Sequence, residues 1–373
     1  MKKFFLFILA VAALMLAVFL GRRWIAPLFF LPRNNGHHNY VEHDADSSVE
    51  EIATDLHIPW DIAFLPDGEM LVTERPGTLY YRSRRGNKRI PIESVYHLEE
   101  GGLLGLVLHP GFQKNHWIYL YATVRKGKKI VNRVERYRFD QGVLTDKKII
   151  IDDIPGAKYH DGGRMAFGPD GYLYITTGDA NNGMLAQDTS SLAGKILRLQ
   201  EDGSLPPDNP FHNEVWSYGH RNSQGITWDK EGNLWSTEHG PSGFASGHDE
   251  LNLIVKGGNY GWPLVRGYET KDGLIPPVLD SGADDTWAPA SALYWDGSVF
   301  FGGLRGEAVY EAQVDQSPVV LLEHFKKKFG RIRAIVLGPD GYFYITTSNT
   351  DGRGFPKKGD DKILKIDPKI FRS

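Results

Sequence analysis

One pattern of hydrophobic and polar positions recurs six times along the chain. In each copy, a short run rich in β-branched and aromatic residues leads into a polar turn and then into a second such run. Short apolar runs bounded by turn residues predict β-strands rather than helices. The copies are residues 63–74, 106–123, 165–179, 226–240, 291–304 and 335–349.

A further short strand is expected after each pair, and no long segment shows the 3.6-residue period of an amphipathic helix. These third strands are predicted at 77–83, 132–140, 194–199, 249–254, 306–314 and 361–367. The turns of successive units lie 44 to 65 residues apart, a spacing typical of propeller blades. We therefore predict an all-β fold, a six-bladed β-propeller over residues 46–373. An irregular array of β-sandwiches is the alternative.

A second pattern is polar and follows the same repeat. In a propeller, the segment that enters the innermost strand of each blade lies at one rim of the central channel. The strand pattern does not explain why charged or ring-bearing residues recur at that register, so the register predicts one binding site. About ten positions before each turn stand His57, Glu100, His160, Arg221, Trp287 and Arg331.

The N-terminus has a different character from the repeats. Two lysines precede an apolar run over residues 4–20, which matches an export signal and is slightly shorter than the ~20 residues typical of a membrane span. No small-residue cleavage site follows, so a membrane anchor at 1–24 is favoured over a cleaved signal peptide. Residues 25–45 are expected to form a tether. The propeller is then extracytoplasmic, on a bacterial cell surface or in the periplasm, either membrane-anchored or secreted.

Composition removes several classes of function. The net charge of the 373 residues is −3, which gives no electrostatic case for nucleic acid. Cysteine is absent, which excludes disulfides and thiolate metal sites. A P-loop and a dinucleotide-binding glycine fingerprint are also missing at the strand-to-helix junctions where such motifs bind phosphates, so a nucleotide ligand is not expected.

His160 is the candidate catalytic base. It stands at the shared register beside glycines that allow a ligand to approach closely, and an imidazole titrates near neutral pH. Asp179 ends the following strand and could orient the ring. A structural histidine and an aspartate that caps a turn are the alternative interpretations.

Arginines gather at the same register. Arg221 and Asn222 lie between glycines, and Arg331 and Arg333 alternate along an extended segment, which places both on one face. Arg305 is a further candidate cation. Because arginine binds carboxylates through a two-pronged fork, the group predicts an anionic ligand with more than one carboxylate or phosphate.

Hard oxygen ligands follow the fourth strand pair. Gly240 and Pro241 offer backbone carbonyls, and Glu250 and Tyr260 follow in an acidic, glycine-rich stretch. Such ligands suit Ca²⁺, although the spacing is not that of an EF-hand. Trp287 offers a flat face for a planar ligand, or packs in the core; the sequence leaves both open.

Together these segments resemble the soluble PQQ-dependent glucose and aldose sugar dehydrogenases of the glucose/sorbosone dehydrogenase family. The resemblance covers nearly all of residues 50–370 and implies the same six-bladed fold. It also implies PQQ and Ca²⁺ as cofactors, an aldose substrate and an external electron acceptor. The motifs that carry it are Glu99–Gly105 (EEGGLLG), His160–Arg164 (HDGGR), Ser217–Asn222 (SYGHRN), Asp249–Asn252 (DELN) and Gly258–Pro263 (GNYGWP).

The resemblance also implies a role for each candidate residue. His160 would take the proton from the sugar C1 hydroxyl while a hydride passes to the quinone. Gly240 and Pro241 would bind the Ca²⁺ next to the cofactor, and Glu250 and Tyr260 a structural Ca²⁺. The implied cofactor contacts are Arg221, Asn222, Tyr268, Trp287, Arg305, Arg331 and Arg333.

Two positions depart from the family pattern and bear on the substrate. Glu100 stands near the substrate where a glutamine is common, and Arg305 replaces a lysine.

Two other function classes remain open. One is a calcium-dependent, lactonase-like hydrolase, which needs a carboxylate-rich channel. The other is a non-catalytic surface propeller that binds a glycan or a protein.

Overall fold

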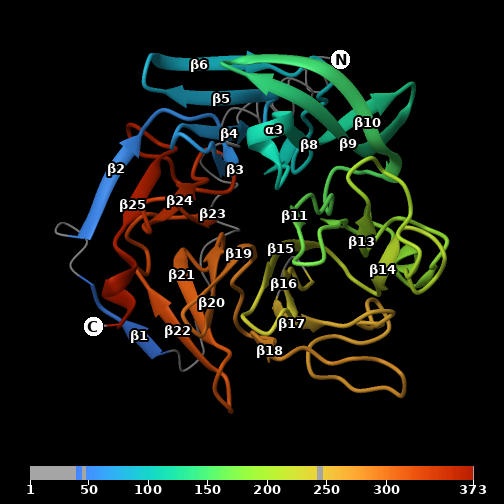
Figure 1. Ribbon diagram of the computed structural model, residues 1–373. Helices are drawn as coiled ribbons and strands as arrows, with labels where there is room; N and C mark the ends of the chain where they lie inside the picture. Colours follow the sequence, from blue (N-terminus) through green and yellow to red (C-terminus); the bar gives the residue numbers. More distant parts are fainter. Residues whose placement is uncertain (1–38, 44–47, 242–246, 373) are drawn as a thin grey trace, which may run out of the picture.

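Six β-sheets are arranged in a ring in the computed structural model, which describes residues 39–43, 48–241 and 247–372 (Figure 1). The six innermost strands contact one another in sequence around the ring, and the last contacts the first. The predicted all-β, six-bladed propeller is confirmed. The predicted anchor at 1–24 lies outside the described residues.

Each blade is an antiparallel sheet whose innermost strand comes first along the chain. Blade 1 is β3 (Pro59–Phe64), β4 (Met70–Glu74), β5 (Thr78–Ser83) and β6 (Gly86–Pro91). Blade 2 is β7 (Leu103–Leu108), β8 (Trp117–Lys126), β9 (Lys129–Asp140) and β10 (Val143–Pro155). Blade 3 is β11 (Met165–Phe167), β12 (Leu173–Thr176), β13 (Lys195–Leu199) and β14 (Val215–Tyr218).

The remaining blades follow the same order. Blade 4 is β15 (Ser223–Trp228), β16 (Leu234–Glu238), β17 (Glu250–Ile254) and β18 (Leu279–Asp280). Blade 5 is β19 (Pro289–Trp295), β20 (Ser298–Gly303), β21 (Ala308–Gln313) and β22 (Val320–His324). Blade 6 is β23 (Ile332–Leu337), β24 (Phe343–Thr347), β25 (Ile363–Ile366) and β2 (Val49–Ala53). The predicted third strands correspond to β5, β9, β13, β17, β21 and β25.

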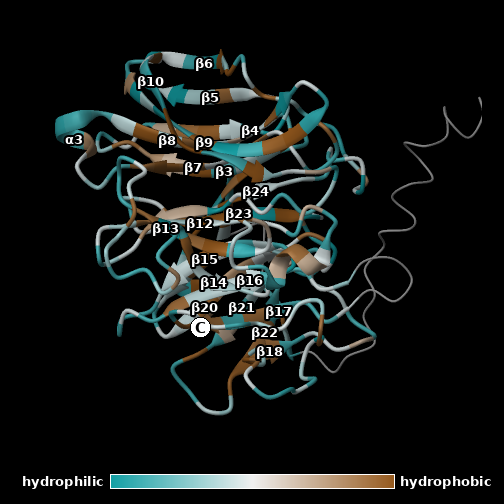
Figure 2. Ribbon diagram, turned by 90° about the vertical axis from the view of Figure 1, so that its right-hand side faces the viewer, coloured by the Kyte–Doolittle hydropathy of each residue, from teal (hydrophilic) through white to brown (hydrophobic). Residues whose placement is uncertain are grey.

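The core lies between neighbouring blades rather than in one central mass. One cluster joins Leu71 and Leu79 of blade 1 to Leu106 and Leu120 of blade 2. Second strands such as β4 are buried along their whole length, because a blade packs another blade on each face. This explains why they appear in the sequence as short continuous apolar runs. Seen from the side, the loops that leave the strands are mostly hydrophilic (Figure 2).

The N-terminal part of the fold closes the ring. Strand β2 pairs antiparallel with β25 and so supplies the outermost strand of blade 6. Strand β1 (Asn39–Val41) pairs in parallel with β22 and adds a fifth strand to blade 5. The predicted tether boundary at residue 45 was therefore wrong. Parallel backbone pairing at a sheet edge needs no apolar side-chain pattern, so this strand left no signal in the sequence.

Within residues 39–43, 48–241 and 247–372, helical structure is confined to short pieces. They are α3 (Phe112–Asn115) and the 3-10 helices η2 (Gly183–Gln187) and η3 (Pro368–Arg372). In the part of the chain that the structure describes, no helix is long and apolar enough to cross a membrane.

Candidate active site

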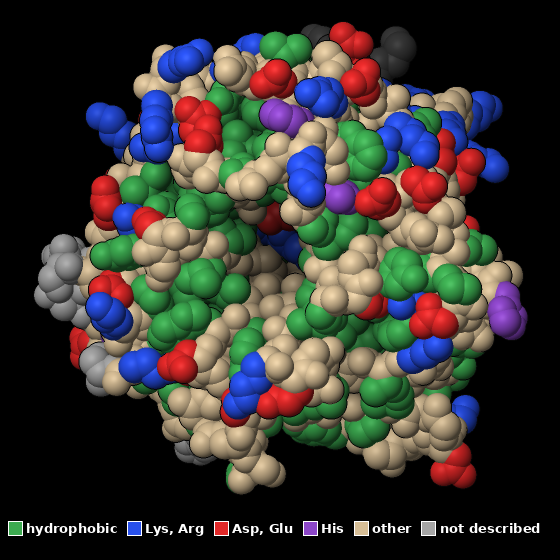
Figure 3. All heavy atoms as spheres, in the orientation of Figure 1, with side chains coloured by type: hydrophobic (Ala, Val, Ile, Leu, Met, Phe, Trp, Pro, Cys, Tyr) green, Lys and Arg blue, Asp and Glu red, His purple; other side chains and the backbone are tan. Residues whose placement is uncertain are grey.

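The centre of the propeller is hollow, and basic and acidic side chains are visible inside it (Figure 3). Each residue of the polar register stands one to five positions before an innermost strand, from His57 before β3 to Arg331 before β23. Glu100, His160 and Arg221 are joined there by direct hydrogen bonds. Three residues of the predicted register therefore lie together.

His160 is fixed from both sides of its ring. Its Nδ1 lies 2.7 Å from Oδ1 of Asp179, and its Nε2 lies 2.9 Å from Nη2 of Arg221. Asp179 is itself held, because its Oδ2 accepts a hydrogen bond of 2.8 Å from Nε1 of Trp262. The predicted pairing of His160 with Asp179 is present.

This arrangement selects one form of the imidazole. A guanidinium can only donate hydrogen bonds, so Nε2 of His160 must accept from Arg221. Nδ1 then carries the proton and donates it to Asp179. The unprotonated nitrogen, which is the one able to take a proton from a substrate, therefore faces Arg221 and the channel.

The backbone at His160 is in an unusual conformation. Its φ is +65°, in the left-handed region that non-glycine residues seldom occupy. A Cβ on Gly178 would lie 1.9 Å from the carbonyl oxygen of His160, so only glycine lets the two segments approach so closely. Asp161 holds the loop through Oδ1, which accepts hydrogen bonds from Ala157 and Asn132. Strain of this kind is typical of functional sites.

Glu100 connects His160 to a residue from the opposite end of the chain. Its Oε2 accepts a hydrogen bond from the backbone of His160 at 3.0 Å, and its Oε1 accepts one from Nη1 of Arg353 at 2.7 Å. Burial alone would raise the pKa of this carboxyl, but Arg353 and His160 hold the pKa of Glu100 well below its usual range. Glu100 is thus a paired carboxylate beside the candidate base.

Arg331 directly precedes β23, and Arg333 lies within it. Arg331 donates from Nε and Nη2 to Oδ2 of Asp351, at 3.1 and 2.8 Å, and from Nη1 to the carbonyl of Leu304. Arg333 donates from Nη1 to Oε1 of Gln224 at 2.6 Å. Both arginines are 3% exposed. Burial, and then the nearby positive charge of Arg75, lowers the pKa of Arg333 to about 9.

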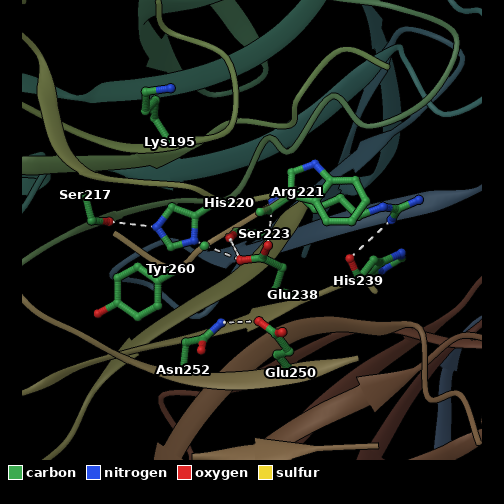
Figure 4. A network of polar contacts seen from close by, with 12 residues as sticks. Lys195, Ser217, His220, Arg221, Ser223, Glu238, His239, Glu250, Asn252 and Tyr260 are labelled. Atoms are coloured by element: carbon green, nitrogen blue, oxygen red, sulfur yellow. Dashed lines mark hydrogen bonds and ion pairs between the residues drawn. The ribbon is translucent and has the colours of Figure 1, made fainter. Parts of the chain in front are cut away.

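The four predicted metal ligands line one small cavity of about 10 Å³, together with Arg221, Glu238, His239 and Trp262. The sequence predicted two separate sites from Gly240, Pro241, Glu250 and Tyr260; the structure places all four around one space, part of which is drawn in Figure 4. A volume of this size is about that of one water or one ion.

Acidic groups adjoin this cavity. Glu238 and Glu250 stand directly opposite each other on β16 and β17, and Asp280 stands opposite Glu250 on β18. Burial, and then the charges of Glu238 and Asp280, raises the pKa of Glu250 well above its usual range. Like charges directly across a sheet are destabilising, and a bound cation would relieve the repulsion. Among the described residues, no three His, Asp or Glu side chains are grouped so as to hold a metal ion by themselves, so backbone oxygens would have to contribute.

Asp249 connects the segment at Gly240, one of the predicted metal ligands, to the neighbouring blade. Its Oδ1 accepts from the backbone of Gly240 at 2.8 Å, and its Oδ2 accepts from Oγ1 of Thr286 and the backbone of Trp287, both at 2.7 Å. The side chain is 3% exposed. Asp249 therefore fixes the position of Gly240 relative to blade 5.

Three predicted residues have other surroundings. Trp287 is 2% exposed and packs on Phe301 and Tyr310, as in the core-packing interpretation, and its predicted cofactor contact stays a prediction. The side chain of His57 is 61% exposed and has Glu74 as its neighbour. Tyr268 is 56% exposed and bonds to the backbone of residues 278 and 280, so its predicted cofactor contact stays a prediction.

Two further cofactor candidates are buried near the others. Asn222 is fully buried, and its Oδ1 accepts from the backbone of Gly162 at 3.0 Å. Arg305 is 9% exposed and follows Leu304, whose carbonyl accepts from Arg331. Both residues therefore adjoin the groups that the sequence predicted to bind an anion.

Sequence reasoning missed several members of the site. Arg353 and Asp351 lie on the loop after β24, and Trp262 lies between β17 and β18. None of them occupies the repeated register, so the repeat gave no signal for them, although Trp262 stands in the GNYGWP motif of the family resemblance. The nearest available signal was local: Asp351 and Arg353 stand in a short charged, glycine-containing segment, Asp351-Gly352-Arg353-Gly354.

Comparison with known proteins gives one consistent family. A family model described as glucose/sorbosone dehydrogenase matches residues 56–356. The aldose sugar dehydrogenase YliI of Escherichia coli K12 is 33% identical over 361 residues, which cover 87% of this chain and 94% of the relative.

Solved structures agree with that family. A putative oxidoreductase (glucose dehydrogenase) from Thermus thermophilus is 43% identical, with a TM-score of 0.80 over 85% of this chain and 99% of that one. The PQQ-bound form of an aldose sugar dehydrogenase from Streptomyces coelicolor is 36% identical, with a TM-score of 0.78 over 86% of this chain and 97% of that one.

Proposed function

Since the chain belongs to the glucose/sorbosone dehydrogenase family, we propose that it is a quinoprotein aldose sugar dehydrogenase. It would oxidise the C1 hydroxyl of an aldose to the lactone, with PQQ and Ca²⁺ as cofactors and an external electron acceptor. The observation that carries the proposal is the geometry of His160, whose unprotonated Nε2 faces a channel lined with arginines.

His160 would act as the general base. Asp179 accepts a hydrogen bond from Nδ1–H and would stabilise the imidazolium that forms when Nε2 takes the proton of the sugar hydroxyl. A positioned base of this kind contributes on the order of 10²–10⁴ in rate. Arg221 shares Nε2 in the present structure, so a substrate hydroxyl would replace that hydrogen bond as it enters.

The residues of the channel fit a planar polyanion such as PQQ. Arg331 and Arg333 are buried, and the Nε of Arg333 and the Nδ2 of Asn222 have no hydrogen-bond partner among the described residues. Arg221 and Arg305 would add further positive charge. When bound, PQQ would itself accept the hydride from the sugar, and Ca²⁺ would polarise the quinone carbonyl.

The cavity beside Arg221 fits a cation bound mainly by backbone oxygens. A Cβ on Gly240 would lie 2.0 Å from the carbonyl oxygen of Gly247 and 2.2 Å from that of His248, which shows how closely these oxygens gather. The carbonyl of Pro241 and the carboxylate of Glu250 complete a set of hard ligands of the kind that Ca²⁺ prefers.

Glu100 would contact the substrate. Its carboxylate is already balanced by Arg353 at 2.7 Å, so the departure from glutamine need not repel the charge of the cofactor. It would instead present an acceptor to a sugar hydroxyl beside His160. This geometry favours a neutral aldose over an acidic sugar, whose carboxylate would meet Glu100.

The two other function classes receive less support. The hydrolase alternative needs a carboxylate-rich channel, whereas Arg333 and its charged neighbours comprise three guanidinium groups (Arg75, Arg331 and Arg333) and two carboxylates (Glu100 and Asp351). A binding propeller would have no need for the strained backbone at His160 or for the base and aspartate pair.

The test is aldose oxidation with an artificial electron acceptor, using purified protein with and without PQQ and Ca²⁺. The His160→Ala variant serves as the catalytic control, and PQQ binding is titrated separately by absorbance. Activity that needs both additions and is lost in the variant is the expected result. Absence of PQQ binding by the wild type would overturn the proposal and favour the binding propeller.

We also propose an extracytoplasmic location with anchoring through the N-terminus. The support is the apolar run at 4–20 after two lysines. Fractionation of cells that express the full chain tests this: the protein should be in the membrane fraction, and removal of residues 1–24 should prevent export.

A further inference from the structure

Arg75 is a buried arginine outside the set of residues assigned to the site so far. It follows β4 directly, at the rim where the candidate site lies, and its carbonyl accepts a hydrogen bond from the backbone of Leu103. The residue is 4% exposed. A Cβ on Gly102 would lie 2.1 Å from the carbonyl oxygen of Arg75 and 2.9 Å from its Cγ, so the side chain lies tightly against the Glu100 loop.

The guanidinium of Arg75 makes few hydrogen bonds for a buried charge. Its single side-chain hydrogen bond runs from Nη2 to the backbone carbonyl of Asp351, at the long distance of 3.5 Å. Its Nε has no hydrogen-bond partner, and it forms no ion pair with any residue that the structure describes. A buried cation in that state is costly unless something else completes its surroundings.

The charges around Arg75 do not balance. Four guanidinium groups face two carboxylates, an excess of two positive charges. The carboxylates are already engaged, Asp351 by Arg331 at 2.8 Å and Glu100 by Arg353 at 2.7 Å. The group consists of Arg75, Arg331, Arg333, Arg353, Glu100 and Asp351.

Arg75 and Arg333, the two arginines of this group that form no ion pair with a described residue, act on each other. After burial, the largest influence that lowers the pKa of Arg333 is the positive charge of Arg75. Each of the two has an Nε without a partner among the described residues. Two buried guanidinium groups that repel each other and retain free donors are what a multi-carboxylate ligand requires from its pocket.

From this we infer that Arg75 is a cofactor-binding residue that pairs with Arg333 to hold a carboxylate of PQQ. The inference rests on the proposed function, because PQQ is the polyanion. It adds to the site an arginine from blade 1, which neither the polar register nor the family motifs contain.

A structural role and a binding role make opposite predictions for stability. If Arg75 supported the fold, its loss would lower the melting temperature of the cofactor-free protein. If it awaits an anion, Arg75→Gln removes a buried charge that faces Arg333, and the melting temperature should stay the same or rise.

The experiment is a titration of Arg75→Gln, Arg75→Lys and wild type with PQQ in the presence of Ca²⁺, followed by tryptophan fluorescence and calorimetry. Arg84→Gln is the matched control, since Arg84 is an exposed arginine of the same blade that contacts the turn at Asp67. The cofactor-free melting temperature is measured for each protein. If Arg75→Gln does not fold, Arg75→Lys supplies the comparison.

The dissociation constant of PQQ should rise about 10- to 100-fold in Arg75→Gln, the range for a lost hydrogen bond to a charged group. Arg75→Lys should lie between the wild type and that value, and Arg84→Gln should match the wild type. An unchanged constant in Arg75→Gln, or a weaker one accompanied by a lower melting temperature, would overturn the inference. Failure of the wild type to bind PQQ would overturn the proposed function itself.

Discussion

The hydrogen bonds of Asp179 allow a sharp test of how His160 is held. Oδ1 of Asp179 accepts from Nδ1 of His160 at 2.7 Å and from the backbone of Asn181 at 2.8 Å, and Oδ2 accepts from Nε1 of Trp262 at 2.8 Å. Both oxygens thus face a donor that cannot turn into an acceptor. Asp179→Asn keeps the shape but replaces one oxygen by an NH₂ group.

Either orientation of that amide creates a conflict. With NH₂ at the Oδ2 position it opposes the indole N–H of Trp262. With NH₂ at Oδ1 it opposes the backbone N–H of Asn181 and donates to Nδ1 of His160, which moves the ring proton to Nε2. Leaving a buried donor unsatisfied costs about 1–3 kcal/mol, and a protonated Nε2 would also oppose Arg221 and could not act as the base.

We therefore expect Asp179→Asn to lower kcat by about 10³–10⁴-fold, since the variant loses both the negative charge and the correct tautomer. Trp262→Phe removes the indole donor, so that in the double variant the NH₂ can occupy the Oδ2 position without conflict. The double variant should then recover about tenfold in kcat, equivalent to about 1.4 kcal/mol.

The assay is steady-state aldose oxidation by the wild type, both single variants and the double variant, all loaded with PQQ and Ca²⁺. Trp262→Phe alone should lower kcat less than Asp179→Asn does, because the carboxylate keeps its charge and its hydrogen bonds to His160 and to the backbone of Asn181. The reasoning is refuted if the double variant is no faster than Asp179→Asn, or if Asp179→Asn retains wild-type activity.

Three other predictions concern pH and metal. Burial raises the pKa of the Asp161 carboxyl from 3.8 to about 7. The folded state therefore keeps a proton that the unfolded state loses, and the free energy of unfolding falls as pH rises from about 4 to 7. In thermal melts at pH 5 and 8, Asp161→Asn should not show this decrease in stability. Burial, and then the charges of His324 and Lys328, lowers the pKa of His43 from 6.5 to about 4. The pairing of β1 with β22 should therefore weaken as pH falls from about 6.5 to 4. Hydrogen exchange measures this: β1 should lose protection at pH 4.5 in the wild type but not in His43→Phe. Ca²⁺ should raise the melting temperature of the wild type but not of Glu250→Gln, and chelator should reverse the gain.

The fold was predictable because each blade repeats one local pattern. Second strands such as β4 and β24 are buried on both faces and stand out as apolar runs between turns. The outermost strands were not predicted individually, since they carry mixed polar residues. The strand β1 was missed because its pairing with β22 uses the backbone of a polar segment.

The polar register predicted at which rim of the propeller the candidate residues lie, but not the direction in which each side chain points. Five of the six innermost strands have a register shift within their first residues, as between Leu103 and Leu106 in β7 and between Pro289 and Ala292 in β19. An extra residue at a bulge turns the following side chains to the other face. Residues at one register therefore need not point one way: the ring of Trp287 is buried, whereas that of His57 is exposed.

The remainder of the site depends on closure of the ring. Glu100 and Arg353 are 253 positions apart and belong to blades 2 and 6, which blade 1 separates. No local pattern relates them. They meet because β2 completes blade 6 and the first and last innermost strands pack together. The same closure brings Arg75 of blade 1 beside Arg333 of blade 6, and so concentrates buried positive charge at one point.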